Sequence, residues 1–333
     1  MILRTGPFSA QVSRRFLWAL PVLLAAVAAL VWIAIGAGAT PTTATERLSA
    51  LRGEGLIGDL RRPRILVALL GGAMTAASGI ILQTVSRNGL ADPGLLGLSQ
   101  GSVVAILIGG LVFGLGSGAL VWVGLGGALA VSVLVLGLGR GTLAGGGIVL
   151  VGLAVNIVLG SVTEIVMTSG DATRFARLAV WSRGSLAGVS AGDLRLIAVW
   201  ALVTVPLLLA LSRHLAPLLL GHDAARGVGV DTRRLLPALV LLAAALSAPV
   251  VVVCGPISFL GLIAGYVARR LVGDAPTEVL VTGMILGGGI LLLADTAGRA
   301  ALAPLVVPAG LMTSVAGVVV FLLAIAADRR LNR

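Results

Sequence analysis

The sequence predicts an all-α polytopic membrane protein with about ten transmembrane helices. Of its 333 residues, 58% are hydrophobic and only 11% are charged, and the mean hydropathy is +1.11. A soluble domain does not have such a composition, because its surface must be largely polar. Apolar stretches of about 20 residues, enough to cross a bilayer, recur along the whole chain. Backbone groups in lipid must satisfy their own hydrogen bonds, and the alternating pattern of an outer-membrane barrel is absent, so these stretches are expected to be helices.

The first span follows a basic segment that contains Arg4, Arg14 and Arg15. Basic residues before an apolar run also occur in cleaved signal peptides, but residues 16–39 are too long for a typical signal core. We therefore expect a first helix, within a single transmembrane domain of residues 1–333. Hydropathy places the ten spans at residues 16–39, 64–86, 95–112, 117–138, 146–168, 194–212, 235–254, 256–270, 278–295 and 308–326.

The second and third spans are separated by the stretch RNGLADPGLLGLSQGS, residues 87–102. Asn, Gly and Asp-Pro are turn residues, so this stretch is expected to turn the chain at the membrane surface, with Asp92 as the N-cap of the third span. A direct contact with transported substrate is the alternative. Pro63 is expected in the first turn of the second span, where proline fits best. The stretch PGLLGLSQG at 93–101 is weakly similar in sequence to PISFLGLIAG at 256–265, as in transporters built from internal repeats.

The later spans are joined by shorter polar turns and one long loop. The loop at 213–234, between the sixth and seventh spans, is polar and rich in arginine. The eighth span is short and requires tilt or burial within the protein. An even number of spans places both termini on one side. The arginines near both termini, with fourteen of the 24 assigned to that side, favour the cytoplasm.

Several classes of chemistry are excluded by composition. All 24 basic residues are arginine, so a phosphate-binding Walker A loop and a Schiff-base lysine are impossible. One cysteine and two distant histidines argue against a zinc site or a disulfide framework. The arginines are scattered singly between spans, which argues against nucleic acid as a partner despite a net charge of +11. No catalytic residue, metal ligand or cofactor is expected.

Five segments resemble, in order, the signatures of permeases of type II ABC importers for iron–siderophores, haem and cobalamin. They begin with RRPRILVALLGGAMTAASGIILQTVSRNGLADPGLLGLSQGS, and together they extend from about Arg61 to Leu323. The other four are WSRGSLAGVSAGDL, LLLGHDAARGVGVDTRRL, GPISFLGLIAGYVARRLVGD and LLLADTAGRAALAPLVVPAG. The resemblance implies the type II ABC importer permease fold of the cobalamin permease. It also implies a subunit that is not itself an enzyme.

The resemblance assigns the 213–234 loop to coupling helices that contact a cytoplasmic ABC ATPase dimer. Adhesion of a basic loop to anionic lipid explains the arginines but not the ordered Gly and Ala positions. The residues expected at the ATPase contact are Gly221, His222, Asp223, Ala225, Arg226 and Gly229.

On the opposite surface, Arg61, Arg64 and Arg299 match family arginines that meet acidic residues of an extracytoplasmic substrate-binding lipoprotein. Anchoring in lipid headgroups is the simpler alternative for them. Thr142 and Leu143 occupy the position of the family's cytoplasmic gate, which could equally be a plain polar turn.

Three polar residues within the spans are notable because placing a polar group in lipid costs free energy. Asn156 and Glu164 lie eight residues apart on the fifth span, nearly on one face, and are candidates for the translocation pathway. Asp295 lies four residues before Arg299 and is expected to be its partner within one helix.

The sequence thus predicts a permease subunit in the bacterial cytoplasmic membrane, paired with a second copy or a paralogue and surrounded by lipid. Iron–siderophore is the expected cargo, with haem or cobalamin as alternatives. An ion-coupled secondary transporter is a weaker hypothesis, and an intramembrane enzyme weaker still. The chain departs from the family pattern at Gly89, His222, Gly265-Tyr266, Val306 and Val319. These departures affect the expected details of docking to the partners and of gating.

Overall fold

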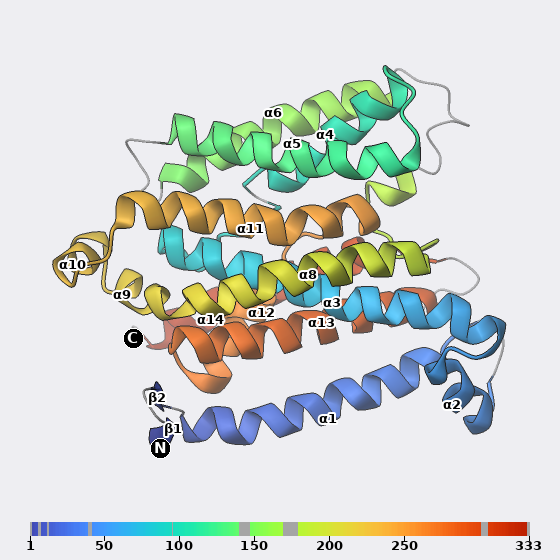
Figure 1. Ribbon diagram of the computed structural model, residues 1–333, viewed down its shortest axis with the longest axis horizontal. Helices are drawn as coiled ribbons and strands as arrows, with labels where there is room; N and C mark the ends of the chain where they lie inside the picture. The colour runs from blue at the N-terminus through green and yellow to red at the C-terminus, as the bar shows by residue number, and fades with distance from the viewer. Residues whose placement is uncertain are drawn as a thin grey trace.

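The computed structural model describes residues 2–5, 8–11, 13–38, 42–94, 96–139, 147–168, 179–300 and 306–331. This part of the chain is almost entirely helical, as expected (Figure 1). A short antiparallel hairpin, β1 (Ile2–Thr5) and β2 (Phe8–Gln11), precedes the first helix and was not foreseen.

Each of the ten expected spans coincides with a helix. Among the described residues, seven helices are long and apolar enough to cross a membrane by length and composition. The helices α4 and α12 have 14 and 13 residues, so each rises only about 20 Å and cannot cross a 30 Å hydrocarbon core alone. The ten are α1 (Arg14–Gly36), α3 (Gly55–Ser86), α4 (Leu98–Leu111), α5 (Ser117–Leu138), α6 (Gly147–Thr168), α8 (Ala191–Leu211), α11 (Thr232–Cys254), α12 (Leu260–Val272), α13 (Pro276–Ala300) and α14 (Ala309–Leu331).

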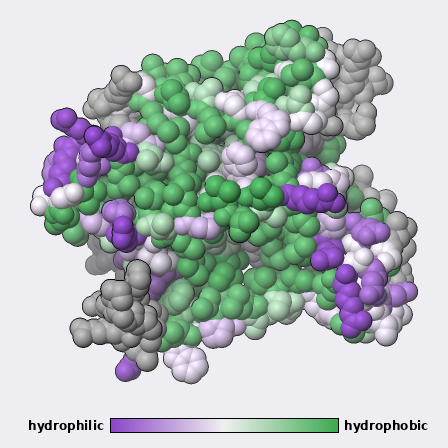
Figure 2. Space-filling model, in the orientation of Figure 1, coloured by the Kyte–Doolittle hydropathy of each residue, from purple (hydrophilic) through white to green (hydrophobic). Residues whose placement is uncertain are grey.

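The long helices run roughly along one direction in three layers (Figure 1). Helices α4, α5 and α6 form one outer layer, α3, α8 and α11 the middle one, and α12, α13 and α14 the other, with α1 outside α13. Hydrophilic residues gather at the two ends of these helices, and the surface between them is hydrophobic (Figure 2). This face of the bundle therefore has two polar ends and an apolar middle, as a membrane-spanning protein requires.

The helices repeat their order in two halves. Both α3–α4–α5–α6 and α11–α12–α13–α14 consist of a long helix, a short one and two long ones. Equivalent pairs pack together, since α3 lies against α13 and α11 lies against α5. Each short helix begins after a residue in the left-handed conformation, Gly97 before α4 and Phe259 before α12. The weak sequence similarity between residues 93–101 and 256–265 therefore corresponds to a structural repeat.

The second span begins earlier than expected. Helix α3 starts at Gly55, so Pro63 lies in its third turn and not in the first. Proline removes a hydrogen bond to the carbonyl four residues before it, here that of Asp59. Asp59 is exposed, so water can satisfy this carbonyl and the helix continues. Before it, the short helix α2 (Ala44–Arg52) has a capping box formed by Thr43 and Glu46.

Glycine supplies the close contacts between helices. A Cβ on Gly79 of α3 would lie 2.6 Å from Gly261 Cα of α12, and one on Gly72 would collide with the backbone at Gly287 of α13. Small residues let helix backbones approach closely in lipid, where apolar burial provides little drive for association. Glycines such as Gly72 and Gly79 thus allow α3 to pack closely against α13 and α12.

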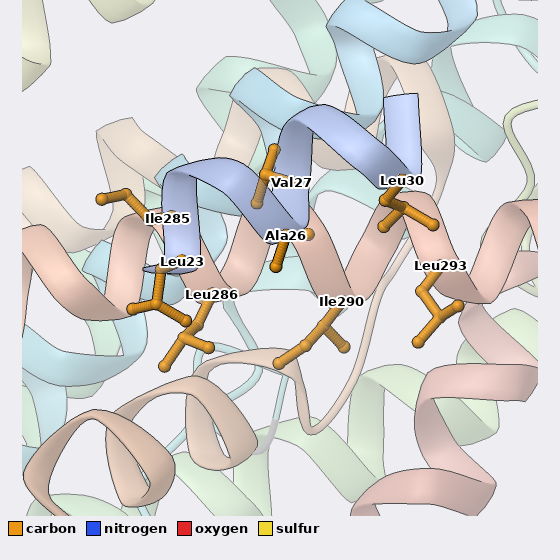
Figure 3. A pocket seen from close by; sticks show the side chains of 9 residues that line it. Leu23, Ala26, Val27, Leu30, Ile285, Leu286, Ile290 and Leu293 are labelled. Atoms are coloured by element: carbon orange, nitrogen blue, oxygen red, sulfur yellow. The ribbon is translucent and has the colours of Figure 1, made fainter. Parts of the chain in front are cut away.

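Helix α1 is the least buried of the seven candidate spans found among the described residues, and its start is bound to α13. The backbone N–H of Ser13 donates to Glu278 Oε1 at 2.7 Å, and its hydroxyl donates to Oε2 at 2.6 Å. Between the two helices runs a groove of about 170 Å³ lined only by hydrocarbon, including Leu23, Val27 and Ile290 (Figure 3). This groove offers no polar recognition chemistry.

Candidate functional site

The expected coupling loop forms short helices at one end of the molecule. A 3₁₀ turn at Ser212–His214 leads into α9 (Leu215–Leu219) and α10 (His222–Gly227), and α11 begins at Thr232. The start of the chain and the end of α14 lie at the same end (Figure 1). The coupling segment, residues 212–231, is therefore on the side of both termini.

The structure divides the six expected contact residues into two groups. Asp223, Arg226 and Gly229 are exposed, whereas Gly221, His222 and Ala225 are buried. The buried three set the shape of the segment, and only the exposed three can touch a partner.

Arg226 joins α10 to the start of α11. Its Nε donates to Thr232 Oγ1 at 2.7 Å, and its guanidinium lies 3.7 Å from the Asp223 carboxylate. Two exposed apolar residues were missed from the sequence, Leu220 at 74% exposure and Val228 at 68%. Both are sequence neighbours of the expected contact residues, and only the folded helices show that they are exposed.

Asp92 does not cap α4 as expected. The N-cap of α4 is Gly97, in the left-handed conformation, and Asp92 Oδ2 instead accepts from Gly94 N at 3.1 Å in the turn. The carboxylate is completely buried at the start of α12, facing the backbone N–H groups of Phe259, Gly261 and Leu262. The positive end of a helix favours an anion there. The two repeats are thus linked by the carboxylate of one at the helix N-terminus of the other.

Burial raises the pKa of Asp92 to about 6, against the opposing effect of these backbone N–H groups. A folded pKa above the unfolded value means that the folded chain binds more protons, so stability falls as pH rises from about 4 to about 6. We expect Asp92→Asn to remove this part of the pH dependence while keeping an oxygen for Gly94 N. Unfolding midpoints measured in detergent from pH 4 to 8 would test this, and identical pH profiles for both proteins would contradict it.

At the opposite end, the expected docking arginines have partners within the protein. Arg64 makes a bidentate contact with Asp295, with Nε–Oδ2 at 2.9 Å and a second N–O distance of 2.7 Å. Arg299 Nε lies 3.3 Å from Asp295 Oδ2, which confirms the expected pair within one helix. Arg61 and Arg299 also donate to the carbonyls of Ile35 and Ala37 at the end of α1.

The three arginines therefore fasten α1, α3 and α13 together. The side chain of Asp295 is 2% exposed, and those of Arg64 and Arg299 are 19% and 12% exposed. A partner protein could therefore contact only the small exposed parts of the two arginines. Arg62 beside them is fully on the surface, where it donates to the Arg52 carbonyl at 3.4 Å. A cavity of about 470 Å³ lies next to Arg64, between α3 and residues 186–191.

The expected pathway residues lie in different surroundings. Asn156 on α6 is half-buried beside Gly97, and among the described residues its Oδ1 has no hydrogen-bond partner. Glu164 is exposed on the same helix, two turns further. Thr142 and Leu143, expected at the gate, lie outside the described residues. In the same described part, no group of three His, Cys, Asp or Glu side chains could hold a metal ion.

Comparison with known proteins agrees with this architecture. The model of the FecCD transport family matches residues 22–327. The Fe(3+)-citrate import system permease protein YfmE of Bacillus subtilis is 35% identical over 93% of this chain and 95% of its own length. The hemin transport system permease protein HmuU of Yersinia pestis is 36% identical over 81% and 83%. The achromobactin transport system permease protein CbrC of Dickeya dadantii is 31% identical over 97% and 95%.

A solved structure agrees as well. The inward-facing structure of an ABC transporter of the metal-chelate type superposes with a TM-score of 0.83 and 25% identity, over 93% of this chain and 99% of the other. The relatives of this chain are transport permeases, and its apolar helices make this chain a multi-pass protein of the bacterial inner membrane. The chain thus belongs to the FecCD transport family, as a permease of the metal-chelate, siderophore and haem class of ABC importers.

Proposed function

We propose that this chain is the permease subunit that carries an iron–siderophore complex across the cytoplasmic membrane, driven by a separate ATPase dimer. The observation that carries the proposal is the coupling segment, two short helices at one polar end with Asp223, Arg226 and Gly229 turned outward. Family membership supports this reading. The end that carries α9, α10 and both termini is then the cytoplasmic one.

The structure supports a mechanical link from the coupling segment into the bundle. Arg226 binds Thr232 in the first turn of α11, and α11 packs against α3, α5 and α8. A movement of α10 would therefore reach the central layer through a rigid helix. The exposed Leu220 and Val228 supply apolar area to a contact in which Asp223 and Arg226 supply charge. ATP hydrolysis belongs to the partner.

An external binding protein would meet the opposite end. Arg61, Arg64 and Arg299 remain the proposed contacts, although their internal partners mean that they act partly by fixing the shape of that surface. Arg62, which is exposed, adds positive charge there. Exposed ion pairs are worth only about 0–1 kcal/mol each, so this docking needs several pairs and should weaken with salt.

The cargo is inferred from what relatives are named for, which are Fe(3+)-citrate, achromobactin and hemin. An iron–siderophore complex fits most of these names, and haem or cobalamin is the alternative. We propose that the cargo passes along the interface with a second permease, either a copy of this chain or a paralogue. Asn156 and Glu164 on α6, and the gate at Thr142 and Leu143, are the residues proposed to border that route.

The experiment that tests the proposal is Arg226→Glu, assayed with the partner ATPase and binding protein in vesicles. Reversing this charge removes the bond to Thr232 and places two acids together at the contact, so we expect at least about a tenfold loss of ATP-driven uptake. Membrane insertion should be unchanged, and ATP hydrolysis should continue without transport.

Arg234→Glu is the matched control, because Arg234 is an exposed arginine at the same end that lies in the first turn of α11, outside α9 and α10. Among the described residues, its ion pair is with Asp231. It should leave uptake within about twofold of wild type, as exposed pairs contribute little. Wild-type uptake by Arg226→Glu would refute the docking assignment. Uphill uptake by vesicles that contain this chain alone would instead favour an ion-coupled secondary transporter.

A further inference from the structure

A polar cavity of about 280 Å³ lies at the end of α3 that faces the coupling segment. Its lining comes from four parts of the chain: the last turn of α3, the turn that follows it, α9 and α12. The residues are Gln83, Thr84, Arg87, Gly89, Leu219 and Arg269. Leu219 is the last residue of α9 in the coupling segment, but none of the six is among the residues proposed for the ATPase contact, the binding-protein contact or the route of the cargo.

The guanidinium of Arg269 is held in place by an amide. Gln83 is 3% exposed, and its Oε1 accepts a hydrogen bond from Arg269. Its Nε2 donates to the carbonyls of Ala91 and Gly261, at 3.3 and 3.2 Å, so the amide cannot rotate without losing both bonds. This arrangement orients the guanidinium but leaves its charge uncompensated, because the amide is neutral.

Arg87 brings a second positive charge to the same cavity. It follows the last residue of α3 in the left-handed conformation, with φ of 51°, and its guanidinium lies beside Gly221. Across the described ranges, no carboxylate oxygen lies within 4 Å of Arg87 or Arg269. Asp274 influences Arg269 only from a longer distance. Two arginines thus share a cavity in which the described residues supply no acidic partner.

The chemistry of this cavity fits a phosphate group. Guanidinium groups present planar pairs of donors that match phosphate oxygens, and an anion between two of them would offset their mutual repulsion. The volume of about 280 Å³ is ample for a phosphate group and lies at the lower end of the range of about 300–1,000 Å³ that is typical for ligand pockets. We propose that this cavity binds a phosphate group between Arg87 and Arg269.

The surroundings indicate where such a phosphate could come from. Leu219 borders the cavity and is 41% exposed, and its neighbour Leu220 is 74% exposed, so apolar surface adjoins the basic pocket. Basic pockets between transmembrane helices on the cytoplasmic side bind anionic lipid headgroups. A phospholipid headgroup and free phosphate share the recognised chemistry, and the experiment below separates them.

The test uses the full-length protein, stripped of lipid in detergent and titrated with three probes: phosphatidylglycerol, inorganic phosphate and diacylglycerol. Binding is followed by the shift of the thermal unfolding midpoint and by native mass spectrometry. We expect a phosphate-containing probe to bind the wild type. Arg87→Gln should bind it about tenfold more weakly, because one charge-assisted contact is lost.

Arg15→Gln is the matched control, since Arg15 is exposed at the same end but distant in sequence and not part of the cavity. It should bind like the wild type. Arg269→Gln should weaken binding as Arg87→Gln does. If Arg269→Gln does not fold because Gln83 loses its partner, Arg87→Gln decides alone, since Arg87 is an exposed turn residue.

The outcomes separate clearly. Binding of phosphatidylglycerol but not of inorganic phosphate assigns the site to a lipid headgroup, and binding of both assigns it to a phosphate group of either origin. Equal binding by wild type and Arg87→Gln overturns the proposal, as does equal binding of diacylglycerol, which lacks phosphate. None of these results depends on what the protein transports.

Discussion

Asp295→Ala is expected to lower the free energy of unfolding by about 3–5 kcal/mol, the cost of breaking a buried ion pair. The carboxylate is 2% exposed and neutralises Arg64, on another helix, and Arg299, one turn away on its own. Removing it leaves two guanidiniums facing each other in a poorly hydrated site. The ion pair between α3 and α13 would then be replaced by repulsion between Arg64 and Arg299.

The measurement is reversible unfolding in mixed micelles, with Asp223→Ala as the control. Asp223 also pairs with an arginine, but it is fully exposed at 3.7 Å from Arg226, so its loss should change stability by no more than about 1 kcal/mol. A similar loss for both variants would show that the Arg64–Asp295–Arg299 cluster adds nothing beyond a surface pair.

Gly79→Ala is expected to destabilise the protein by about 1–3 kcal/mol, the usual effect of overpacking. The added methyl would lie 2.6 Å from Gly261 Cα, so α3 and α12 would have to separate. Gly261 also adjoins the buried Asp92 carboxylate, with 3.0 Å between a Cβ placed there and Oδ1. A shift at this contact would therefore also disturb the link between the two repeats.

Gly160→Ala on α6 provides the matched comparison, because a Cβ at that glycine meets nothing within 4 Å. Alanine is favoured over glycine within a helix by about 1 kcal/mol, so this variant should be as stable as the wild type or more so. If the two alanine variants unfold alike in the same assay, the close approach of α3 and α12 is not required for stability.

The sequence by itself determined the membrane class, the positions of the ten helices and the family. Lipid imposes these features through length and polarity alone, because a span needs about 20 apolar residues and a turn needs polar or turn-forming ones. The resemblance added the coupling loop, and the structure places two short helices there. The spacing of Asp295 and Arg299 likewise predicted a pair that the structure shows.

Only the tertiary structure decided which side of each helix is buried. Lipid is as apolar as a protein core, so a span such as α5 carries no polar face to show its orientation. On α6, Leu150 and Ile148 are equally apolar, yet Leu150 is 71% exposed and Ile148 only 1%. In α10 the sequence did not separate the exposed Arg226 from the buried Ala225 as contact residues, because packing decides how a six-residue helix is oriented.

The tertiary structure also brought together groups that are far apart along the chain. Arg64 and Asp295 are 231 residues apart, and Asp92 sits at the start of a helix that begins at Leu260. Arg87 and Arg269 border one cavity although nothing in the sequence links them. Local composition thus predicted where the helices lie, although not that α3 begins at Gly55, whereas packing between distant helices decides which charges meet.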